Sequence, residues 1–373
     1  MQQQGAHNHI SFFWQRAVIK VGSALISPGG DGCKTASLLA LAQFVNDSRA
    51  AGKEVILVSS GAVAAGKNAF TLQREPSLSE KQAMAAVGQT RMMANWARLF
   101  DQPTAQILLT HGDIRSRDHY LNIKGTIREL LAHGMLPVVN ENDSVATDEL
   151  KFGDNDNLAA LVALVAEADT LLICTDVDGL YDADPRSVPT ARLLKRVEKI
   201  DAQVMALGGG AVSGVGTGGM QTKLQAARKA AHNGIQTIIA NGFKSQTFMQ
   251  LAQGDVPGTL FVPPLSRTSA KKNWLMHSLR AKGRIIIDQG AAEALAHKGA
   301  SLLPVGVVKV EGAFDAGEAV EIVQGDNILA TGLCQYNAHT LAQISGLNSQ
   351  QVEQKLGYSS YAVAVHRDDL VLF

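Results

Sequence analysis

Apolar residues follow two alternating patterns along this chain. Short continuous apolar runs, typical of strands buried on both faces, alternate with longer segments in which apolar residues recur at helical spacing. The runs that predict strands are AVIKV (17–21), EVILVSS (54–60), TAQILLT (104–110), MLPVVNEND (135–143), TLLICT (170–175) and QTIIA (236–240). The predicted helices are 35–51, 79–100 with Ser79 as N-cap, 117–134, 158–168 and 221–232. This order predicts an α/β fold with a doubly wound, mostly parallel sheet sandwiched by helices.

The pattern changes after about residue 273. Short runs at 284–287, 305–310, 318–323 and 327–332, with glycine turns and a helix-like segment at 290–299, predict a small β-rich domain. A chain of 373 residues is also long enough for about two domains. The stretch 262–272 carries prolines and serines and predicts the boundary. We therefore predict an N-terminal extension (1–16), a core domain (17–262), a linker (263–275) and a C-terminal domain (276–373).

Lys20 lies inside an otherwise apolar strand and precedes the turn Gly22-Ser23. A buried ammonium group is costly unless it emerges beside an anion, so this position indicates phosphate. A lysine that reaches solvent from an edge strand is the alternative.

A glycine-rich stretch begins at Leu207 and leads into the helix predicted at 221–232. Seven glycines between Gly208 and Gly219 are too flexible for a helix or strand interior, whereas the following Ala, Gln, Lys and Arg residues favour helix. The start of such a helix attracts anions, and Lys223 adds a full charge there. A surface loop with a solvated lysine remains the alternative. GVGTGG (214–219) matches a dinucleotide fingerprint, but no strand precedes it and no acid follows at the ribose position.

GAVAAGKN (61–68) differs by one residue from a phosphate-binding loop. Asn68 replaces the hydroxyl that would hold magnesium, and AVAA favours helix over an open loop. We interpret the segment as a helix that starts at Ser60-Gly61, with Lys67 in solvent. Because it follows a strand, the start of this helix is a candidate site for a substrate carboxylate.

The most polar part of the core domain is NENDSVATDELKFGDNDN (140–157), which follows a predicted strand. Its six acids are Glu141, Asp143, Asp148, Glu149, Asp154 and Asp156. They predict either a cation site or hydrogen bonds to a small polar substrate. An EF-hand is excluded, because the spacing D-x-[DN]-x-[DN]-G of that loop is absent after Asp154 and Asp156. The alternative to a binding site is a solvated loop in which Asp156 or Asn157 caps the next helix.

Composition narrows the class of protein. With 46% hydrophobic and 18% charged residues, the chain is typical of soluble globular proteins, and no apolar run predicts a membrane span or a secretory signal. Three cysteines in no metal-like spacing predict a reducing, cytoplasmic setting. The net charge is zero, and residues 271–373 carry nine Lys or Arg against ten Asp or Glu, a balance of −1. That balance does not favour tight RNA binding.

Six segments together resemble the amino-acid kinase family, in particular its members that phosphorylate glutamate. They are IKVGSALI, SSGAVAAG, VNENDSVAT, FGDNDNLAA, CTDVDGLYDADPR and GVGTGGMQTKLQAA. The tail, from IIIDQGAAEALAHKG to ATGLCQYN, resembles a PUA domain. The resemblance covers roughly residues 17–367. Ser23-Ala24 departs from it, because Thr-Ser is common there in the family.

The resemblance implies ATP-dependent phosphorylation of the side-chain carboxylate of L-glutamate, for proline biosynthesis. It implies that Lys20 and Lys223 neutralise the transferring phosphoryl group and that Asp156 holds both ammonium groups. Implied glutamate-binding residues are Ser60, Asp143 and Asn155. Implied ATP-binding residues are Lys20, Thr175, Asp176, Thr217, Gly218, Gly219, Met220, Gln221, Thr222 and Lys223.

The resemblance further implies Mg²⁺ brought with the nucleotide, with unknown protein ligands, feedback inhibition by proline and a homo-oligomer, either dimer or tetramer. A carboxylate is already ionised at neutral pH, so the reaction needs no general base. Three alternatives stay open: a sibling carboxylate or carbamate kinase, an RNA-binding module acting through its tail, and a dehydrogenase.

Overall fold

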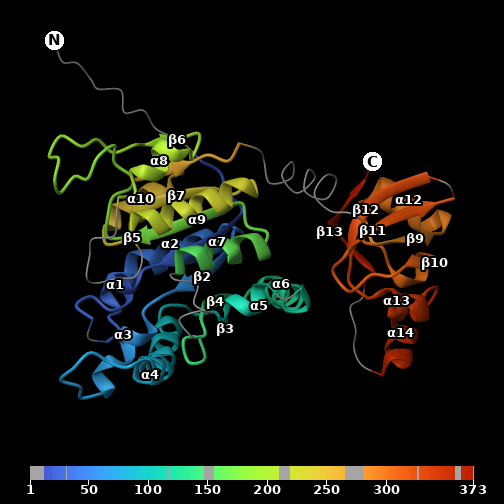
Figure 1. The fold of residues 1–373 in the computed structure, drawn as a ribbon, viewed down its shortest axis with the longest axis horizontal. Helices are drawn as coiled ribbons and strands as arrows, with labels where there is room; N and C mark the ends of the chain where they lie inside the picture. Colours follow the sequence, from blue (N-terminus) through green and yellow to red (C-terminus); the bar gives the residue numbers. More distant parts are fainter. Residues whose placement is uncertain are drawn as a thin grey trace, which may run out of the picture. The chain divides into compact units, whose positions relative to one another are not determined.

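The structure is a computed structural model that describes residues 12–30, 32–115, 117–146, 155–209, 219–264, 281–325, 327–357 and 363–372. It divides into two compact units (Figure 1). The first comprises Met1–Arg115 and Ile123–Arg267, and the second comprises Ser116–Asn122 and Thr268–Phe373. No described helix is both long and apolar enough to cross a bilayer. The domain limits given above remain predictions.

An eight-stranded sheet forms the centre of the first unit, in the order β3-β4-β2-β1-β5-β7-β8-β6. Its strands are β1 (Arg16–Val21), β2 (Glu54–Ser59), β3 (Thr104–Leu109), β4 (Leu136–Glu141), β5 (Thr170–Thr175), β6 (Arg196–Val197), β7 (Gln236–Asn241) and β8 (Thr259–Phe261). Among the described strands of this sheet, only β7 and β8 pair antiparallel. The predicted α/β fold with a mostly parallel sheet is therefore confirmed.

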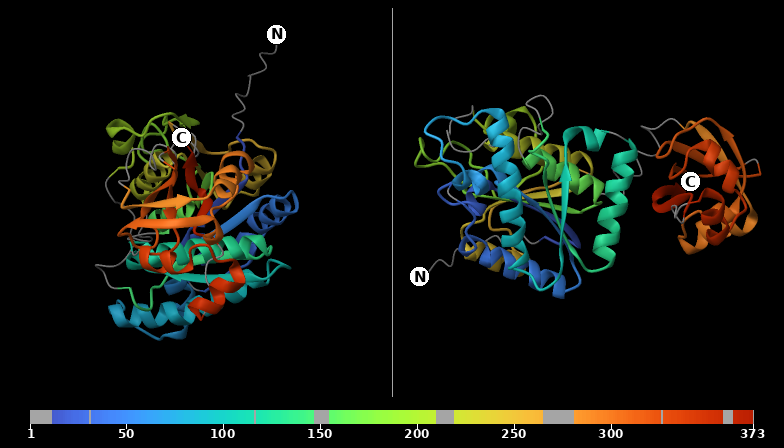
Figure 2. Two further views of the ribbon diagram at one scale, coloured as in Figure 1. Left: turned by 90° about the vertical axis from the view of Figure 1, so that its right-hand side faces the viewer. Right: turned by 90° about the horizontal axis from the view of Figure 1, so that it is seen from below.

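Helices cover both faces of this sheet (Figure 2). The α-helices between residues 23 and 252 are α1 (Ser23–Ile26), α2 (Leu39–Ala50), α3 (Ala62–Gly66), α4 (Leu78–Ala97), α5 (His111–Arg115), α6 (Arg117–Ala132), α7 (Asn155–Val165), α8 (Ala202–Ala206), α9 (Met220–His232) and α10 (Ser245–Ala252). Single 3₁₀ turns η1 (Ala36–Leu38) and η2 (Lys67–Ala69) flank α2 and α3. Helices α7 and α9 pack together over the strands at the centre of the sheet, and α2 packs with α10.

β1 lies between β2 and β5, so both of its edges are paired. Its residues Ala17, Ile19 and Val21 belong to the hydrophobic cluster that contains the buried side chains of α2 and α10. Because side chains alternate along a strand, Lys20 projects from the opposite face, which α7 covers. The alternative of a lysine reaching solvent from an edge strand is therefore wrong.

Two of the predicted helix starts that are shifted in the structure have a clear local cause. The N-cap of α4 is Ser77 rather than Ser79, because Ser77 forms a reciprocal capping box with Glu80. Helix α3 starts at Ala62, after Gly61 with φ of 95°. Both shifts arise from local hydrogen bonding and backbone angles that apolar spacing does not report.

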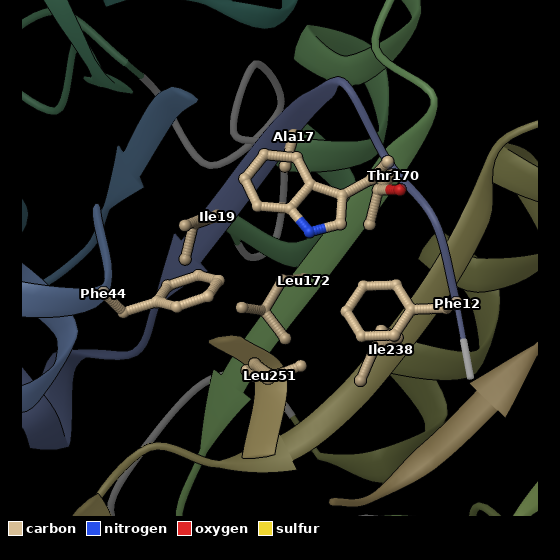
Figure 3. Close-up of a pocket in the computed structure, with 9 residues that line it drawn as sticks. Phe12, Ala17, Ile19, Phe44, Thr170, Leu172, Ile238 and Leu251 are labelled. Carbon is tan, nitrogen blue, oxygen red and sulfur yellow. The ribbon is translucent and has the colours of Figure 1, made fainter. Parts of the chain in front are cut away.

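The described end of the predicted N-terminal extension packs into the core of the first unit. The side chains of Phe12 and Trp14 are buried, and the Phe12 amide donates to Gly254 O at 3.1 Å. Figure 3 shows Phe12, Leu172 and Ile238 around a small apolar hollow on this face of the sheet. Residues 12–15 therefore cover the sheet.

The second unit contains a five-stranded sheet in the order β10-β9-β11-β12-β13. Its elements are β9 (Gly283–Ile287), α12 (Gln289–Lys298), η4 (Pro304–Gly306), β10 (Val307–Gly312), β11 (Ala319–Gln324), β12 (Asn327–Cys334), α13 (Ala338–Ile344), α14 (Ser349–Leu356) and β13 (Val365–Leu372). The four short strands expected from the sequence are present, whereas α13, α14 and β13 were not expected. A separate hydrophobic cluster fills this unit.

Two glycines allow α3 and α4 to touch backbone to backbone. A β-carbon on Gly88 would lie 1.8 Å from Ala62 O, and one on Gly66 would lie 1.9 Å from Met84 O. Neither position has room for a methyl group, and backbone atoms cannot move aside as a flexible side chain can. This contact fixes the helix that follows Ser60.

Gly88→Ala is expected to destabilise the first unit, although alanine favours helix over glycine by up to about 1 kcal/mol. Overpacking of this kind costs about 1–3 kcal/mol or more, so the clash with Ala62 O decides the sign. The measurement is urea unfolding followed by tryptophan fluorescence. Gly125→Ala in α6 is the matched control, because a β-carbon there meets nothing within 4 Å. This substitution should raise the free energy of unfolding. Equal behaviour of the two variants would contradict the clash.

Candidate active site

Three charged side chains meet at the carboxyl end of β1. Lys20 Nζ lies 2.7 Å from Asp156 Oδ1, and Lys223 Nζ lies 3.0 Å from Asp156 Oδ2. The Asp156 side chain is fully buried, and the lysine side chains are only 8% and 6% exposed. β1, α7 and α9 each contribute one member. The arrangement carries one net positive charge, with the two ammonium groups on either side of one carboxylate.

The environment of Asp156 keeps it ionised. Burial raises the pKa of this carboxyl, but the charges and hydrogen bonds of Lys20 and Lys223 outweigh burial and hold the pKa below its usual value. Asp156 is in the first turn of α7, where a negative charge is also favourable. It is therefore a buried counter-ion and not the solvated helix cap considered above.

Helix α9 brings Lys223 to the site. Its N-cap residue, Gly219, has no side chain to cap the first turn, and Lys223 is the fourth residue of the helix. Thr222 Oγ1 lies 2.9 Å from Asp156 Oδ2 and 2.8 Å from Gly219 O. The hydroxyl therefore fixes the helix start against the carboxylate, a contact that residue types alone did not predict. Gly219, Met220 and Gln221 lie in the same turn, while Thr217 and Gly218 fall outside the described residues.

Ser60 follows β2 and lies beside the end of β1, because β1 and β2 are parallel neighbours. The Ser60 amide donates to Val21 O at 3.1 Å. Gly61 adopts φ of 95°, and a β-carbon there would lie 3.3 Å from Ser23 Cα. The turns that follow β1 and β2 are therefore packed on each other, at the same end of the sheet as the lysine pair.

Asn155 precedes Asp156 and connects three elements through its side-chain amide. Its Nδ2 donates to Ser59 O at 2.9 Å and to Asn140 Oδ1 at 2.8 Å. Asn140 Nδ2 in turn donates to Gln89 Oε1 at 2.9 Å. Asp143 lies in the turn after β4, partly buried. Of the acids between Glu141 and Asp156, the structure does not describe Asp148, Glu149 and Asp154.

Gln89 and Asn140 are buried polar residues that the sequence-based candidates did not include. Gln89 is 8% exposed and Asn140 is 1% exposed. The available signal for Gln89 was its place on the apolar face of α4, with Ala85, Met92 and Trp96 at helical spacing.

Thr175 is the last residue of β5 and Asp176 follows it, next to the end of β7. Thr175 Oγ1 donates to Asp176 Oδ1 at 3.0 Å, and the Gly242 amide donates to Thr175 O at 2.8 Å. Asn241 Nδ2 donates to Asp176 O at 3.2 Å and to Asp178 Oδ1 at 3.0 Å. Asn241 thus joins the two strand ends. The sequence-based candidates did not include Asn241.

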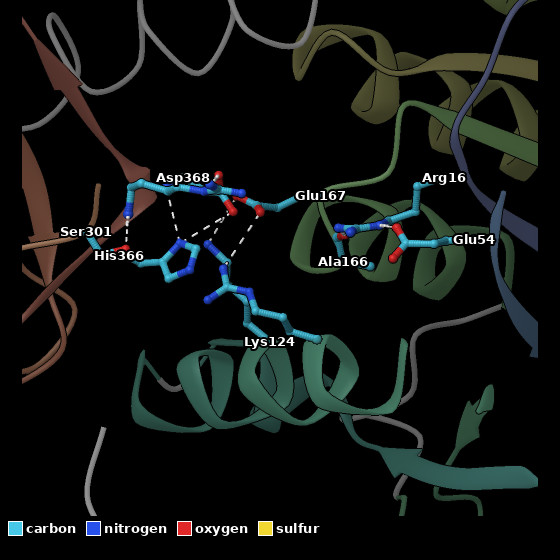
Figure 4. Close-up of polar contacts among 10 residues, drawn as sticks. Arg16, Glu54, Lys124, Ala166, Glu167, Ser301, His366 and Asp368 are labelled. Carbon is cyan, nitrogen blue, oxygen red and sulfur yellow. Dashed lines mark hydrogen bonds and ion pairs between the residues drawn. The ribbon is translucent and has the colours of Figure 1, made fainter. Parts of the chain in front are cut away.

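Two further groups on or beside β1, Cys174 and Arg16, do not belong to the ion group. Burial raises the pKa of the Cys174 thiol to about 12, although Lys20 opposes the shift, so this thiol is protonated at neutral pH. Arg16 donates to Glu54 and to Ala166 O, each at 2.6 Å, at the other end of β1 (Figure 4). Within the described residues, no three His, Cys, Asp or Glu side chains gather as a metal site.

Comparisons with known proteins identify the family to which the chain belongs. Residues 15–241 match the amino acid kinase family, and residues 283–356 match the PUA domain. A solved UMP kinase from Bacillus anthracis covers 68% of this chain and 97% of its own, with 15% identity and a TM-score of 0.48. The chain belongs to the amino acid kinase family, as the resemblance predicted.

Curated relatives narrow the class to the glutamate 5-kinases. The glutamate 5-kinase of Idiomarina loihiensis is 51% identical over 362 residues, which cover 96% of this chain and 98% of that protein. The one from Salinibacter ruber is 51% identical and covers 96% and 97%. The one from Xanthomonas euvesicatoria is 49% identical and covers 95% and 100%. This chain is accordingly a kinase with a C-terminal PUA domain.

Proposed function

We propose that this chain transfers the γ-phosphoryl group of ATP directly to the side-chain carboxylate of L-glutamate. The product is L-glutamyl 5-phosphate, and the reaction is the first step of proline biosynthesis. A carboxylate oxygen forms the new bond to phosphorus. The bond from phosphorus to the bridging oxygen of ADP breaks, and ADP leaves with the electron pair. No proton has to move, because the acceptor is already ionised at neutral pH.

The observation that carries the proposal is the buried Lys20–Asp156–Lys223 group. Phosphoryl transfer between two anions is catalysed chiefly by positioning and charge neutralisation. Lys20 and Lys223 supply two positive charges from separate elements, and Asp156 holds them 2.7 and 3.0 Å from its oxygens. Their low exposure strengthens their interaction with a phosphate, since water screens them little.

The remaining roles in the proposal are those that the resemblance to the family implies. Ser60, Asp143 and Asn155 bind glutamate, with Asp143 on the α-ammonium group and Ser60 on a carboxylate. Thr175, Asp176 and residues 217–223 bind ATP, which arrives as its Mg²⁺ complex and adds to the countercharge. Feedback inhibition by proline, a homo-oligomer and a cytoplasmic location belong to the same proposal. The three cysteines are free, which suits a reducing compartment.

The test is incubation of the full chain with ATP, Mg²⁺, L-glutamate and hydroxylamine, which traps an acyl phosphate as a hydroxamate. Hydroxamate should form only when both ATP and glutamate are present. An absence of glutamate-dependent product would refute the proposal, and product with aspartate alone would identify a sibling kinase. Salt-sensitive RNA binding without hydroxamate would favour the alternative that the tail acts as an RNA-binding module.

A further inference from the structure

A row of three side-chain amides runs beneath the predicted glutamate site. It starts at Ser59 O on β2, passes through Asn155 at the start of α7 and Asn140 at the end of β4, and ends at Gln89 on α4. The three hydrogen bonds measure 2.9, 2.8 and 2.9 Å. Four elements that are distant in sequence are therefore joined next to Ser60 and Asp156.

The hydrogen-bond direction in this row is fixed by its first member. A backbone carbonyl only accepts, so Asn155 must present Nδ2 to Ser59 O. The second hydrogen of Nδ2 then points to Asn140, which must accept through Oδ1 and donate through Nδ2. Gln89 must accept through Oε1. A reversal of any one amide would place two donors or two acceptors face to face.

This direction determines which part of Asn155 is left for a ligand. Both Nδ2 hydrogens are used within the protein, so only Oδ1 remains, and Oδ1 can only accept. An ammonium group donates three hydrogen bonds, whereas a carboxylate only accepts. Asn155 therefore suits the α-ammonium group of an amino acid and cannot donate to its carboxylates through Nδ2.

We infer that Gln89 is a positioning residue of the glutamate site, an inference that rests on the proposed function. By accepting from Asn140, Gln89 holds Asn140 Oδ1 toward Asn155 and so keeps Asn155 Oδ1 available to the substrate ammonium group. Without this acceptor, Asn140 is free to turn its Nδ2 toward Asn155. The side-chain amide of Asn155 then loses its fixed orientation. Gln89 acts through Asn140 and Asn155 and selects acceptors that carry an amine.

The test compares glutamate with glutarate, which has both carboxylates but no amine. In Gln89→Met, which keeps side-chain length without a hydrogen-bonding group, kcat/KM for glutamate should fall on the order of 10- to 100-fold, since small misplacements of binding groups have effects of that size. The KM for ATP and the Ki of glutarate as a competitive inhibitor should stay unchanged. Gln89→Glu keeps an acceptor for Asn140 and should restore most of the glutamate affinity.

Gln43→Met is the matched control, because Gln43 is exposed on α2 and bonds only Asp47 among the described contacts. Equal weakening of glutamate and glutarate in Gln89→Met would show general loosening and overturn the inference. An unchanged KM for glutamate in Gln89→Met would also overturn the inference. If Gln89→Met does not fold, as judged by circular dichroism, Gln89→Leu serves the same comparison. Failure of the wild-type chain to phosphorylate glutamate would instead refute the proposed function.

Discussion

Lys223→Met is expected to lower kcat by a factor on the order of 10² to 10³, the usual effect of removing one preorganised charge donor from a transition state. The melting temperature should change little, because Asp156 keeps Lys20 as a partner at 2.7 Å. Lys20→Met should behave in the same way, because Asp156 then keeps Lys223 as a partner at 3.0 Å. Steady-state kinetics and thermal unfolding of each variant provide the measurement.

Lys229→Met is the control for the helix itself. Lys229 is on α9 as well, but its side chain is exposed and contacts Asn157 rather than Asp156. This variant should keep wild-type kcat. If Lys223→Met lost folding and activity together, the lysine would be structural, and the two-lysine mechanism would lose its support.

Asp156→Asn should lower the free energy of unfolding by about 3–5 kcal/mol, because it leaves two buried ammonium groups without a counter-ion. The three members of the group thus differ: either lysine can be removed with little effect on stability, whereas the carboxylate cannot. Combining Asp156→Asn with Lys223→Met should recover part of the loss, since only one unpaired cation then remains. Urea unfolding of the single and double variants measures this coupling.

The stability difference between wild type and Asp156→Asn should depend on pH with a definite sign. The pKa of Asp156 is lowered on folding, so its contribution is complete above the unfolded value of about 4 and is lost as pH falls through the folded value. The two proteins should converge in acid. Asp178→Asn is the comparison, because Asp178 pairs with the half-exposed Lys244 and should change stability by at most about 1 kcal/mol. A constant difference from neutral to acid pH would contradict the assignment.

The alternation of strands and helices was readable from the sequence because parallel strands buried on both faces are continuously apolar. Lys20 was conspicuous for the same reason, as a charge inside such a strand. Periodicity did not reveal which strand is central, and that position is what excludes solvent from Lys20. Phe12 and Trp14 escaped notice because they belong to no regular element, although they bury against the sheet.

The site was only partly predictable, because several of its contacts join segments that are distant in the sequence. Motif spacing drew attention to Lys20, Asp156 and Lys223, and the structure brings these three together, while their catalytic roles stay predictions. The contacts of Gln89 with Asn140 and of Asn241 with Asp178 join segments 51 and 63 residues apart. Such pairings depend on how strands are ordered in the sheet, and no local pattern encodes that order.

The group formed by Lys20, Asp156 and Lys223 also bears on when a folding chain becomes active. Asp156 and Lys223 are 67 residues apart, and Lys20 is in the first strand of the sheet. Contacts between such distant segments form late, because the entropy of closing long loops must be overcome first. Because β1 to β5 all precede α9 along the chain, a nascent chain makes these strands before α9 can complete the charge pair. Recovery of phosphoryl transfer should then lag behind recovery of secondary structure.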